Sequence, residues 1–446
     1  MGQDGTLASK MTCAVKIEGL LDLDAVQKTI QTIVNRHEAL RTTLSEDGDF
    51  QIIAPFLAIN TPLTDFSAVK EDEQDAKVKD WFTKQSVETV DLCNGPLFKV
   101  SILKLTTTTH ILVFEVHHAV VDGWSMEIIL QEFGQIYTLT TNDHKPTLAL
   151  PVQFREFMKW QTEQMQSAEM ADHVAYWLAQ FKDDIPVLLL PTDNPRPKVR
   201  TYDGAKQSKR LSTAMSKYLK QVAKENGWTL FMTTLGVYTA FLHQLSKQDA
   251  FVIGVPTGGR FFEGKDSMIG YCAHLLAIRS VTTSTATIID HINLLKVTLL
   301  DAFKHQAYPF AELLNKLNVP RNPSLPPMIT GVFNLEVELP IQQAFDLKID
   351  LMAPPVSYVE YDLELNVIQV DDEIQLDFHY NTHLFESETI EQWLYYLEIL
   401  FKRLFEESEQ PVATVYEALE KETKKAQQLQ ARSKFKQLRR KRLKRS

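Results

Sequence analysis

The sequence predicts a mixed α/β (α+β) protein of two lobes, because strand and helix patterns alternate through both halves of the chain. Its 446 residues correspond to about three average domains or two large ones. A Pro-rich stretch at 185–200 predicts the crossing between the lobes. We therefore expect an N-terminal lobe over 1–180, a C-terminal lobe over 181–420, and a basic tail over 421–446 that serves as a linker or docking segment.

The first half opens with a helical pattern over 24–44, which Asp22 or Asp24 can cap. Residues 97–117 then read as two strands joined by a Thr-rich turn. A further helical pattern follows at once over 124–137. The order strand, short loop, helix leaves a polar junction between the second strand and this helix.

The second half repeats the mixture. Helical periodicity covers 211–245, and the apolar run 251–256 reads as a buried strand. Further helices are predicted at about 286–304 and 387–406, and further strands near 328–337, 361–370 and 373–380.

Composition excludes several classes of protein. Hydrophobic residues make up 44% and charged residues 23%, which rules out wholesale disorder and fibrous folds. The three cysteines, Cys13, Cys93 and Cys272, have no metal-ligand spacing, so a disulfide scaffold and most thiolate zinc sites are excluded. Without an apolar run of about 18 residues or an apolar signal core, the chain is expected to be cytoplasmic and off the membrane.

Charge is concentrated at the end of the chain. The whole chain carries −10, residues 421–446 carry +11, and the remaining 420 residues therefore carry −21. Because an acidic body repels phosphate backbones, we expect no nucleic-acid partner. The tail has only scattered apolar residues, so it predicts a solvated helix or disordered terminus rather than a membrane-binding stripe.

The junction His117-His118-Ala119-Val120-Val121-Asp122-Gly123 holds the densest group of reactive side chains. Histidine can accept and return a proton near neutral pH, and two adjacent histidines at a strand end point to opposite faces. The aspartate can fold back on the loop or pair with a distant arginine, and the glycine permits close approach. From spacing alone, a catalytic and a structural role for the pair both remain open.

HHAVVDGWS resembles the HHxxxDG motif of the condensation domains of non-ribosomal peptide synthetases, whose superfamily includes chloramphenicol acetyltransferase. Other segments resemble further motifs of that family in the right order, over roughly residues 11–410. They include RHEALRTTL (36–44), VQFREFMKWQ (152–161), IGVPTGGR (253–260) and MIGYCAHLLAIRS (268–280).

This resemblance implies two chloramphenicol-acetyltransferase-like lobes forming a V-shaped pseudo-dimer with a central tunnel. Donor and acceptor carrier proteins would dock on opposite faces and bring 4'-phosphopantetheine arms to the histidine motif. An acceptor amine would attack a donor acyl thioester and give an amide. The resemblance implies no intrinsic cofactor and no metal, a monomeric chain, and neighbouring synthetase domains as further partners.

Roles follow residue by residue from the resemblance. His118 matches the catalytic histidine, which either accepts the amine proton or only orients the amine. His117 is expected to be structural, and Gly123 to line the tunnel. Asp122 matches the loop-shaping aspartate, with Arg279 as its expected partner.

Four more residues are expected near the active centre, namely Asn334, His274, Trp124 and Ser125. His274 stands where the family commonly has asparagine, as an extra titratable group or as a hydrogen-bonding substitute. The chain also lacks the early SxAQxRLW-type motif, a segment that helps wall the donor side in the family.

Variants of the family are disfavoured by the motif itself. Cyclisation relatives replace the histidines by paired aspartates, and epimerisation relatives continue HHxxxDGxSWR, whereas this chain continues DGWSMEII. Two other functions stay open: a free-standing acyltransferase that uses a CoA thioester or a free amine or alcohol acceptor, and a non-catalytic docking domain.

Overall fold

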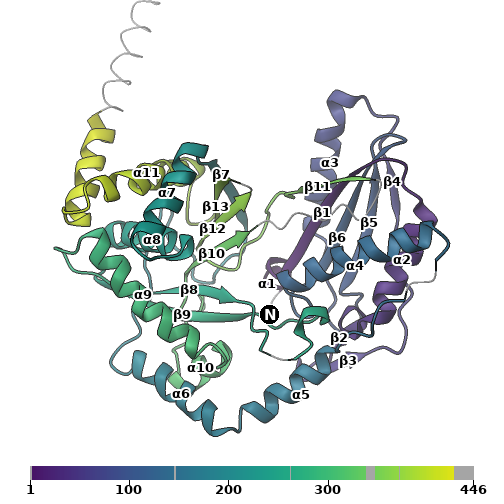
Figure 1. The fold of residues 1–446 in the computed structure, drawn as a ribbon, viewed down its shortest axis with the longest axis horizontal. Helices are drawn as coiled ribbons and strands as arrows, with labels where there is room; N and C mark the ends of the chain where they lie inside the picture. Colours follow the sequence, from purple (N-terminus) through teal and green to yellow (C-terminus); the bar gives the residue numbers. More distant parts are fainter. Residues whose placement is uncertain (1–2, 145–146, 262, 338–346, 371, 426–446) are drawn as a thin grey trace, which may run out of the picture.

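The structure is a computed structural model that describes residues 3–144, 147–261, 263–337, 347–370 and 372–425. It confirms the mixed α/β fold and contains a five-stranded sheet, a six-stranded sheet and a small two-stranded ribbon among the described residues. Figure 1 shows the two large sheets on opposite sides of the molecule, with the start of the chain between them.

The first sheet has the strand order β11-β1-β6-β5-β4. Its strands are β1 (Lys10–Glu18), β4 (Leu63–Asp65), β5 (Phe98–Lys104), β6 (Thr109–His117) and β11 (Lys348–Met352). Helices α2 (Leu23–Arg36) and α4 (Gly123–Thr141) pack together in the larger hydrophobic core of this lobe. Helix α3 (Glu71–Ser86) buries Val78 and Phe82 in a separate cluster that includes Leu103 and Val113. Helices therefore supply the apolar surface that covers the sheet.

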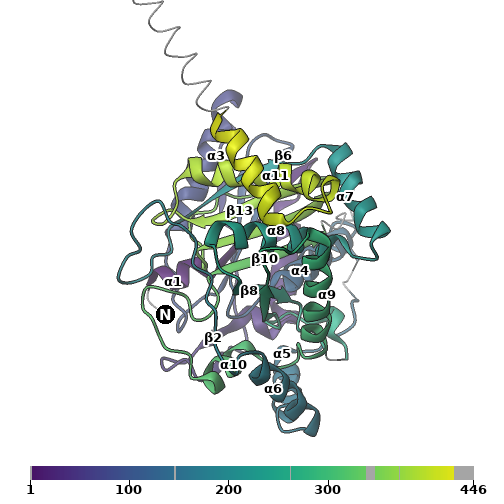
Figure 2. The same ribbon diagram turned by 90° about the vertical axis from the view of Figure 1, so that its left-hand side faces the viewer.

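The second sheet has the order β7-β13-β12-β10-β8-β9, and Figure 2 shows β13, β10 and β8 one below another. Its strands are β7 (Gly204–Arg210), β8 (Ala250–Thr257), β9 (His274–Val281), β10 (Gly331–Val337), β12 (Leu363–Val370) and β13 (Glu373–Asn381). Helices α7 (Thr213–Glu225), α8 (Leu230–Ser246), α9 (Ile288–Lys304) and α11 (Ser387–Glu406) contribute to one large hydrophobic core with it. Alternate residues of β12 and β13 are apolar and lie in that core, as do Val332, Phe333 and Leu335 of β10, so the intervening polar residues of β12 and β13 face away from it.

Connecting segments run between the sheets along one side of the molecule (Figure 1). They are α5 (Phe154–Gln164) and α6 (Ala168–Gln180), after which the Pro-rich stretch has no helix and only an isolated bridge at Val187. The remaining elements are α1 (Gln3–Ala8), η1 (Glu38–Arg41), β2 (Thr42–Leu44), β3 (Gln51–Ile53), η2 (Lys265–Ser267), α10 (Phe310–Leu317) and a helix over 412–425. No helix in the described ranges is long and apolar enough to cross a membrane.

The division of the chain at residue 180 stays a prediction, and β11 complicates it. This strand lies in the second half of the sequence but pairs with β1 of the first sheet, with Ala14 opposite Met352. Most of the basic tail, 426–446, lies outside the described residues.

Two predicted helices end earlier than their apolar spacing suggests. The helix predicted over 24–44 ends at Arg36, because His37 takes an extended conformation and the side chains of both residues bind Glu132 of α4. The pattern over 211–245 forms two helices, separated at Gly227, whose φ of +64° is the left-handed conformation that glycine tolerates best. Asp22, not Asp24, caps the first helix through a hydrogen bond from Ala25 N.

Candidate active site

The histidine junction is held between a strand end and a helix start. β6 ends at His117 and α4 begins at Gly123, with Asp122 as the helix N-cap accepting from Ser125 N at 2.8 Å. The backbone N–H of His118 donates to Ser9 O at 2.8 Å. Backbone bonds on one side and the helix cap on the other therefore fix the loop.

The His118 ring is oriented by the loop itself. Its Nδ1 lies 3.1 Å from Val121 O, and because a carbonyl only accepts, this contact requires the proton on Nδ1 and leaves Nε2 unprotonated. The ring also meets Tyr271 edge-on, with centroids 5.7 Å apart. Burial lowers the pKa of His118, against the opposing effects of Glu360 and Asp122, so the imidazole is mainly neutral at pH 7. Nε2 is thus the nitrogen able to accept a proton.

Asp122 pairs with Arg260, and the predicted pairing with Arg279 is wrong. Asp122 Oδ1 lies 2.8 Å from Arg260 Nη2, and the two side chains are only 3% and 5% exposed. Arg279 instead pairs with Asp184 at 2.6 Å, where the aspartate side chain is 57% exposed. The physical reason is position: Arg279 lies on β9 beside the segment that follows α6, whereas Arg260 lies on the loop after β8 that reaches the histidine junction.

We call residues 258–273, between β8 and β9, the crossing loop. Arg260 Nη1 donates to the carbonyls of Lys265 and Met268, while its Nη2 donates to Asp122 and Ser125. Ser125 Oγ also lies 2.9 Å from Gly270 O and 3.0 Å from Gly270 N. These bonds hold the crossing loop of one lobe against the histidine junction of the other.

Gly259 is required by this packing. Its φ is +60°, and a Cβ built there would lie 1.7 Å from the backbone oxygen of Cys272. The amide of Cys272 in turn donates to Asp122 Oδ2 at 3.0 Å. The close approach of the backbone at Gly259 to that at Cys272 therefore brings both the Cys272 amide and the Arg260 guanidinium within hydrogen-bond distance of Asp122.

The predicted residues around the helix start fall in different environments. Gly123 and Trp124 are exposed, and a Cβ at Gly123 would meet no atom within 4 Å. The Arg260 guanidinium lies 6.0 Å from the centre of the Trp124 ring. Ser125 is fully buried behind Asp122, so it supports the loop instead of facing open space. His117 is also buried and its Nδ1 accepts from Ala119 N at 3.1 Å, which favours the expected structural role.

The structure does not bring His274 and Asn334 into contact with the histidine junction. His274 Nδ1 donates to Gln306 O at 2.8 Å, Nε2 lies 3.3 Å from Gln161 Nε2, and burial lowers the pKa of the ring. A neutral ring with both nitrogens engaged favours the hydrogen-bonding alternative for His274. Asn334 lies on the polar side of β10 and donates to Glu336 Oε1 at 2.8 Å.

A cavity of about 390 Å³ is lined by residues of both lobes, and no residue of the histidine junction is among its lining. Lys10, which lines it, follows Ser9, whose carbonyl binds the His118 amide and whose Oγ lies 2.5 Å from Glu360 Oε1. Its other polar lining includes Thr12, Ser86, Lys206, Glu336, Ser357, Tyr358, Asn366, Gln375, Asp377 and His379. Side chains of both lobes therefore line a space of ligand size, and Lys10 in its wall follows Ser9, the hydrogen-bond partner of the His118 amide.

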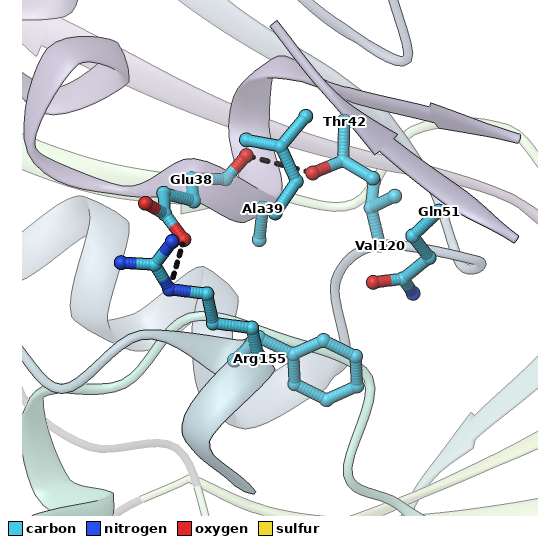
Figure 3. Close-up of a pocket in the computed structure, with 8 residues that line it drawn as sticks. Glu38, Ala39, Thr42, Gln51, Val120 and Arg155 are labelled. Carbon is cyan, nitrogen blue, oxygen red and sulfur yellow. Dashed lines mark hydrogen bonds and ion pairs between the residues drawn. The ribbon is translucent and has the colours of Figure 1, made fainter. Parts of the chain in front are cut away.

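A second hollow lies behind the histidine junction and is far smaller. Figure 3 shows it between Glu38, Thr42, Gln51 and Arg155, with Val120 at its edge. Its volume of about 10 Å³ holds at most one water, so it is no substrate site. Within the described ranges, no group of three or more His, Cys, Asp or Glu side chains is arranged to hold a metal ion.

Comparison with known proteins identifies the family, since the family model named Condensation domain matches residues 3–427 of this sequence. This chain belongs to the condensation-domain family. Tyrocidine synthase 3 from Brevibacillus parabrevis contains a region that is 32% identical over 401 residues, which covers 90% of this chain and 6% of the synthase. Such domains of non-ribosomal peptide synthetases are acyltransferases that form amide bonds and work with carrier domains.

Solved structures show the same fold. The first condensation domain of the calcium-dependent antibiotic synthetase, in complex with a substrate analogue, superimposes with a TM-score of 0.77 at 15% identity, covering 92% of this chain and 93% of that one. The condensation domain of the monacolin K polyketide synthase MokA gives a TM-score of 0.79 at 19% identity, covering 91% and 94%. The condensation domain described here spans only a small part of the curated synthetases it matches.

Sequence reasoning missed Arg260, Tyr271 and Glu360 as neighbours of the histidine junction. None of the three lies on a strand or helix, so no periodicity marks them. The one available signal was the Gly-Gly pair before Arg260, which indicates a tight backbone approach there.

Proposed function

We propose that this condensation domain joins a donor acyl or peptidyl thioester to an acceptor aminoacyl group, each held on the phosphopantetheine arm of a carrier protein. The observation that carries the proposal is the His118 ring, whose Nδ1–H is held by Val121 O and whose Nε2 is left as a proton acceptor. The proposal is also supported by the cavity that both lobes line, because Lys10 in its wall follows Ser9, whose carbonyl accepts from the His118 amide.

The chemistry balances without a further reagent. The acceptor amine attacks the thioester carbonyl carbon, and His118 Nε2 takes the proton that the nitrogen loses as the N–C bond forms. The tetrahedral intermediate then breaks its C–S bond, and the imidazolium returns the proton to the departing sulfur. Positioned proton transfer of this kind contributes about 10²–10⁴ to the rate. A second role for the same nitrogen is to orient the amine without taking its proton.

Asp122 is a positioning residue in this proposal. Its two oxygens are occupied by Arg260, Ser125 and the amide of Cys272. It therefore shapes the loop that aims His118 and takes no proton from the substrate.

The test loads donor and acceptor carriers and follows the amide on the acceptor carrier by intact-protein mass spectrometry. His118→Ala should lose at least about 100-fold in rate. The control is His383→Ala, since His383 pairs with Asp203 outside the histidine junction and is half exposed. Full activity of the first variant would refute both roles of the imidazole.

The same assay separates the alternatives. Amide or ester formation from CoA thioesters, without carriers, would indicate a free-standing acyltransferase. Absence of product from every loaded pair would favour the docking domain. We further propose a cytoplasmic monomer that works with neighbouring synthetase domains, and assign the tail 421–446 to linkage or docking. Deletion of the tail should then weaken transfer from the partner without lowering the melting temperature.

A further inference from the structure

The polar side of the second sheet brings three carboxylates together near the histidine junction. Strand β10 contributes Glu336, strand β12 contributes Glu364, and Glu360 lies just before β12. Their carboxylates act on one another, because Glu336 and Glu360 both raise the pKa of Glu364. We call these three residues the acidic row. It runs from Ser9, beside His118, to the cavity that Glu336 lines.

Lysines of the cavity do not neutralise the acidic row. Lys10 pairs with Glu115 at 2.7 Å, and Lys206 pairs with Asp377 at 3.1 Å. Both ammonium groups are therefore already balanced by other carboxylates.

The contacts of the acidic row itself are almost all to neutral groups. Glu336 accepts from the amide of Asn334, and Glu360 accepts from the hydroxyl of Ser9. Glu364 lies 3.9 Å from His379, whose pKa burial lowers to about 4, so that ring is neutral at pH 7. Within the part of the chain that the structure describes, no Lys or Arg forms an ion pair with these three carboxylates.

Asn366 adds an independent sign of a missing ligand. It lines the same cavity, is only 7% exposed, and lies opposite Asn334 in the register of β12 and β10. Its Nδ2 lies 3.4 Å from His379 Nδ1, but its Oδ1 has no hydrogen-bond donor among the described residues. A buried acceptor without a donor is costly, and a ligand that donates a hydrogen bond would relieve the cost.

The electrostatic cost of the acidic row points the same way. Burial, reinforced by Glu336 and Glu360, raises the pKa of Glu364 to about 7. Burial, reinforced by Asp377 and Glu127, also raises the pKa of Glu336. These carboxylates thus lack the cation that would normally stabilise their charge.

We propose that the acidic row and Asn366 Oδ1 bind a primary ammonium group, so that this condensation domain selects a substrate whose side chain carries a basic amine. The inference rests on the proposed function and narrows its substrate class. An ammonium has three donors and no acceptor, which matches a set made only of acceptors. It must be a second amine of the substrate, because the nitrogen that attacks the thioester has to be neutral. The amine can arrive on the donor or on the acceptor.

The test compares lysyl with norleucyl substrates, which differ by the terminal amine. One arm places the pair on the donor carrier, with the α-amine acetylated and glycine on the acceptor. The other arm places the pair on the acceptor carrier, opposite an acetyl donor. In one arm, kcat/KM for the lysyl substrate should exceed that for the norleucyl substrate by about 10- to 100-fold, the range for hydrogen bonds to charged groups.

Two variants locate the preference. Glu336→Gln and Glu364→Gln should each reduce the lysyl-to-norleucyl ratio by about tenfold. Glu373→Gln is the matched control: this carboxylate lies at the far end of β13, bonded to Thr213, and its loss should leave the ratio unchanged. Equal rates for both substrates in both arms, or a ratio that neither the Glu336 nor the Glu364 variant changes, would overturn the proposal.

A binding measurement separates this inference from the proposed function. Calorimetric titration of the wild-type chain uses pantetheine amides of lysine and norleucine, which cannot react. Tighter binding of the lysyl amide without any turnover of loaded carriers would sink the proposed function and keep the ammonium site. Equal affinity for the two amides, together with amide formation from loaded carriers, would sink the ammonium site alone. Because this comparison needs no variant, it decides the question even if a substitution unfolds the chain.

Discussion

Replacing Arg260 by methionine should destabilise this condensation domain by about 3–5 kcal/mol, the cost of removing one partner of a buried ion pair. The arginine and Asp122 side chains are 5% and 3% exposed, so water cannot take the place of the guanidinium. The carbonyls of Lys265 and Met268 also lose a donor each. In the variant, Asp122 still accepts hydrogen bonds from the backbone amides of Ser125 and Cys272. These two bonds limit the loss of unfolding free energy to the range given above.

The assay is urea unfolding at pH 7, followed by tryptophan fluorescence. It compares the single variants Arg260→Met and Asp122→Asn with the double variant that carries both changes. Because the asparagine carries no charge, the double variant should be more stable than the sum of the two single losses by about 1–3 kcal/mol. Arg279→Met is the matched control and should cost about 1 kcal/mol or less, because its partner Asp184 is largely exposed. A loss below about 1 kcal/mol for Arg260→Met, or an equal loss for the control, would refute the argument from burial.

Three further predictions follow from the loop and the core. Since burial lowers the pKa of His118, kcat/KM should fall on acidification with a midpoint below the usual histidine value of about 6.5; a midpoint above it would contradict a desolvated ring. Gly259→Ala should cost about 2 kcal/mol or more, seen as a lower melting temperature, because its Cβ would meet Cys272 O at 1.7 Å; Gly258→Ala, where nothing lies within 4 Å, is the control. Burial lowers the pKa of His243 to about 4, so its stabilising contribution is complete above pH of about 6.5 and is lost as the pH falls through about 4. The wild-type protein should therefore lose about 3 kcal/mol more unfolding free energy between pH of about 6.5 and about 4 than the His243→Asn variant does. An equal loss in both proteins would contradict a contribution from His243 protonation.

Most of the fold could be predicted from the sequence because apolar periodicity records which face of each element is buried. The strand–loop–helix order around His118 is correct for this reason, as are β8 and α9. The pattern could not show where a helix stops when the apolar spacing continues past its end. At His37 a hydrogen bond to Glu132, 95 residues away, accompanies the end of the helix, and local spacing carries no trace of that contact.

The candidate site could be predicted only in part. The histidine junction is local, so its cap and its histidines follow from neighbouring residues. The arginine partner is not local. Arg260 lies 138 residues from Asp122, on a loop without periodicity, and the family resemblance pointed to Arg279 instead. The acidic row was missed although a trace was present, because Glu364 and Asn366 alternate with apolar residues along β12. Alternation shows which face is polar, but not that an opposing lobe covers it.

Strand β11 has a consequence for how the two halves can move. Its five residues, Lys348–Met352, pair with β1 along the edge of the first sheet, so the second half is tethered to the first by a ladder of backbone bonds. Pulling the halves straight apart would tear that ladder, whereas a swing about it would not. The next residues, 353–358, contain a stiff Pro-Pro pair and form part of the cavity wall. A swing about this strand would therefore widen or narrow the cavity, which would couple the angle between the sheets to the room beside Glu336 and Asn366.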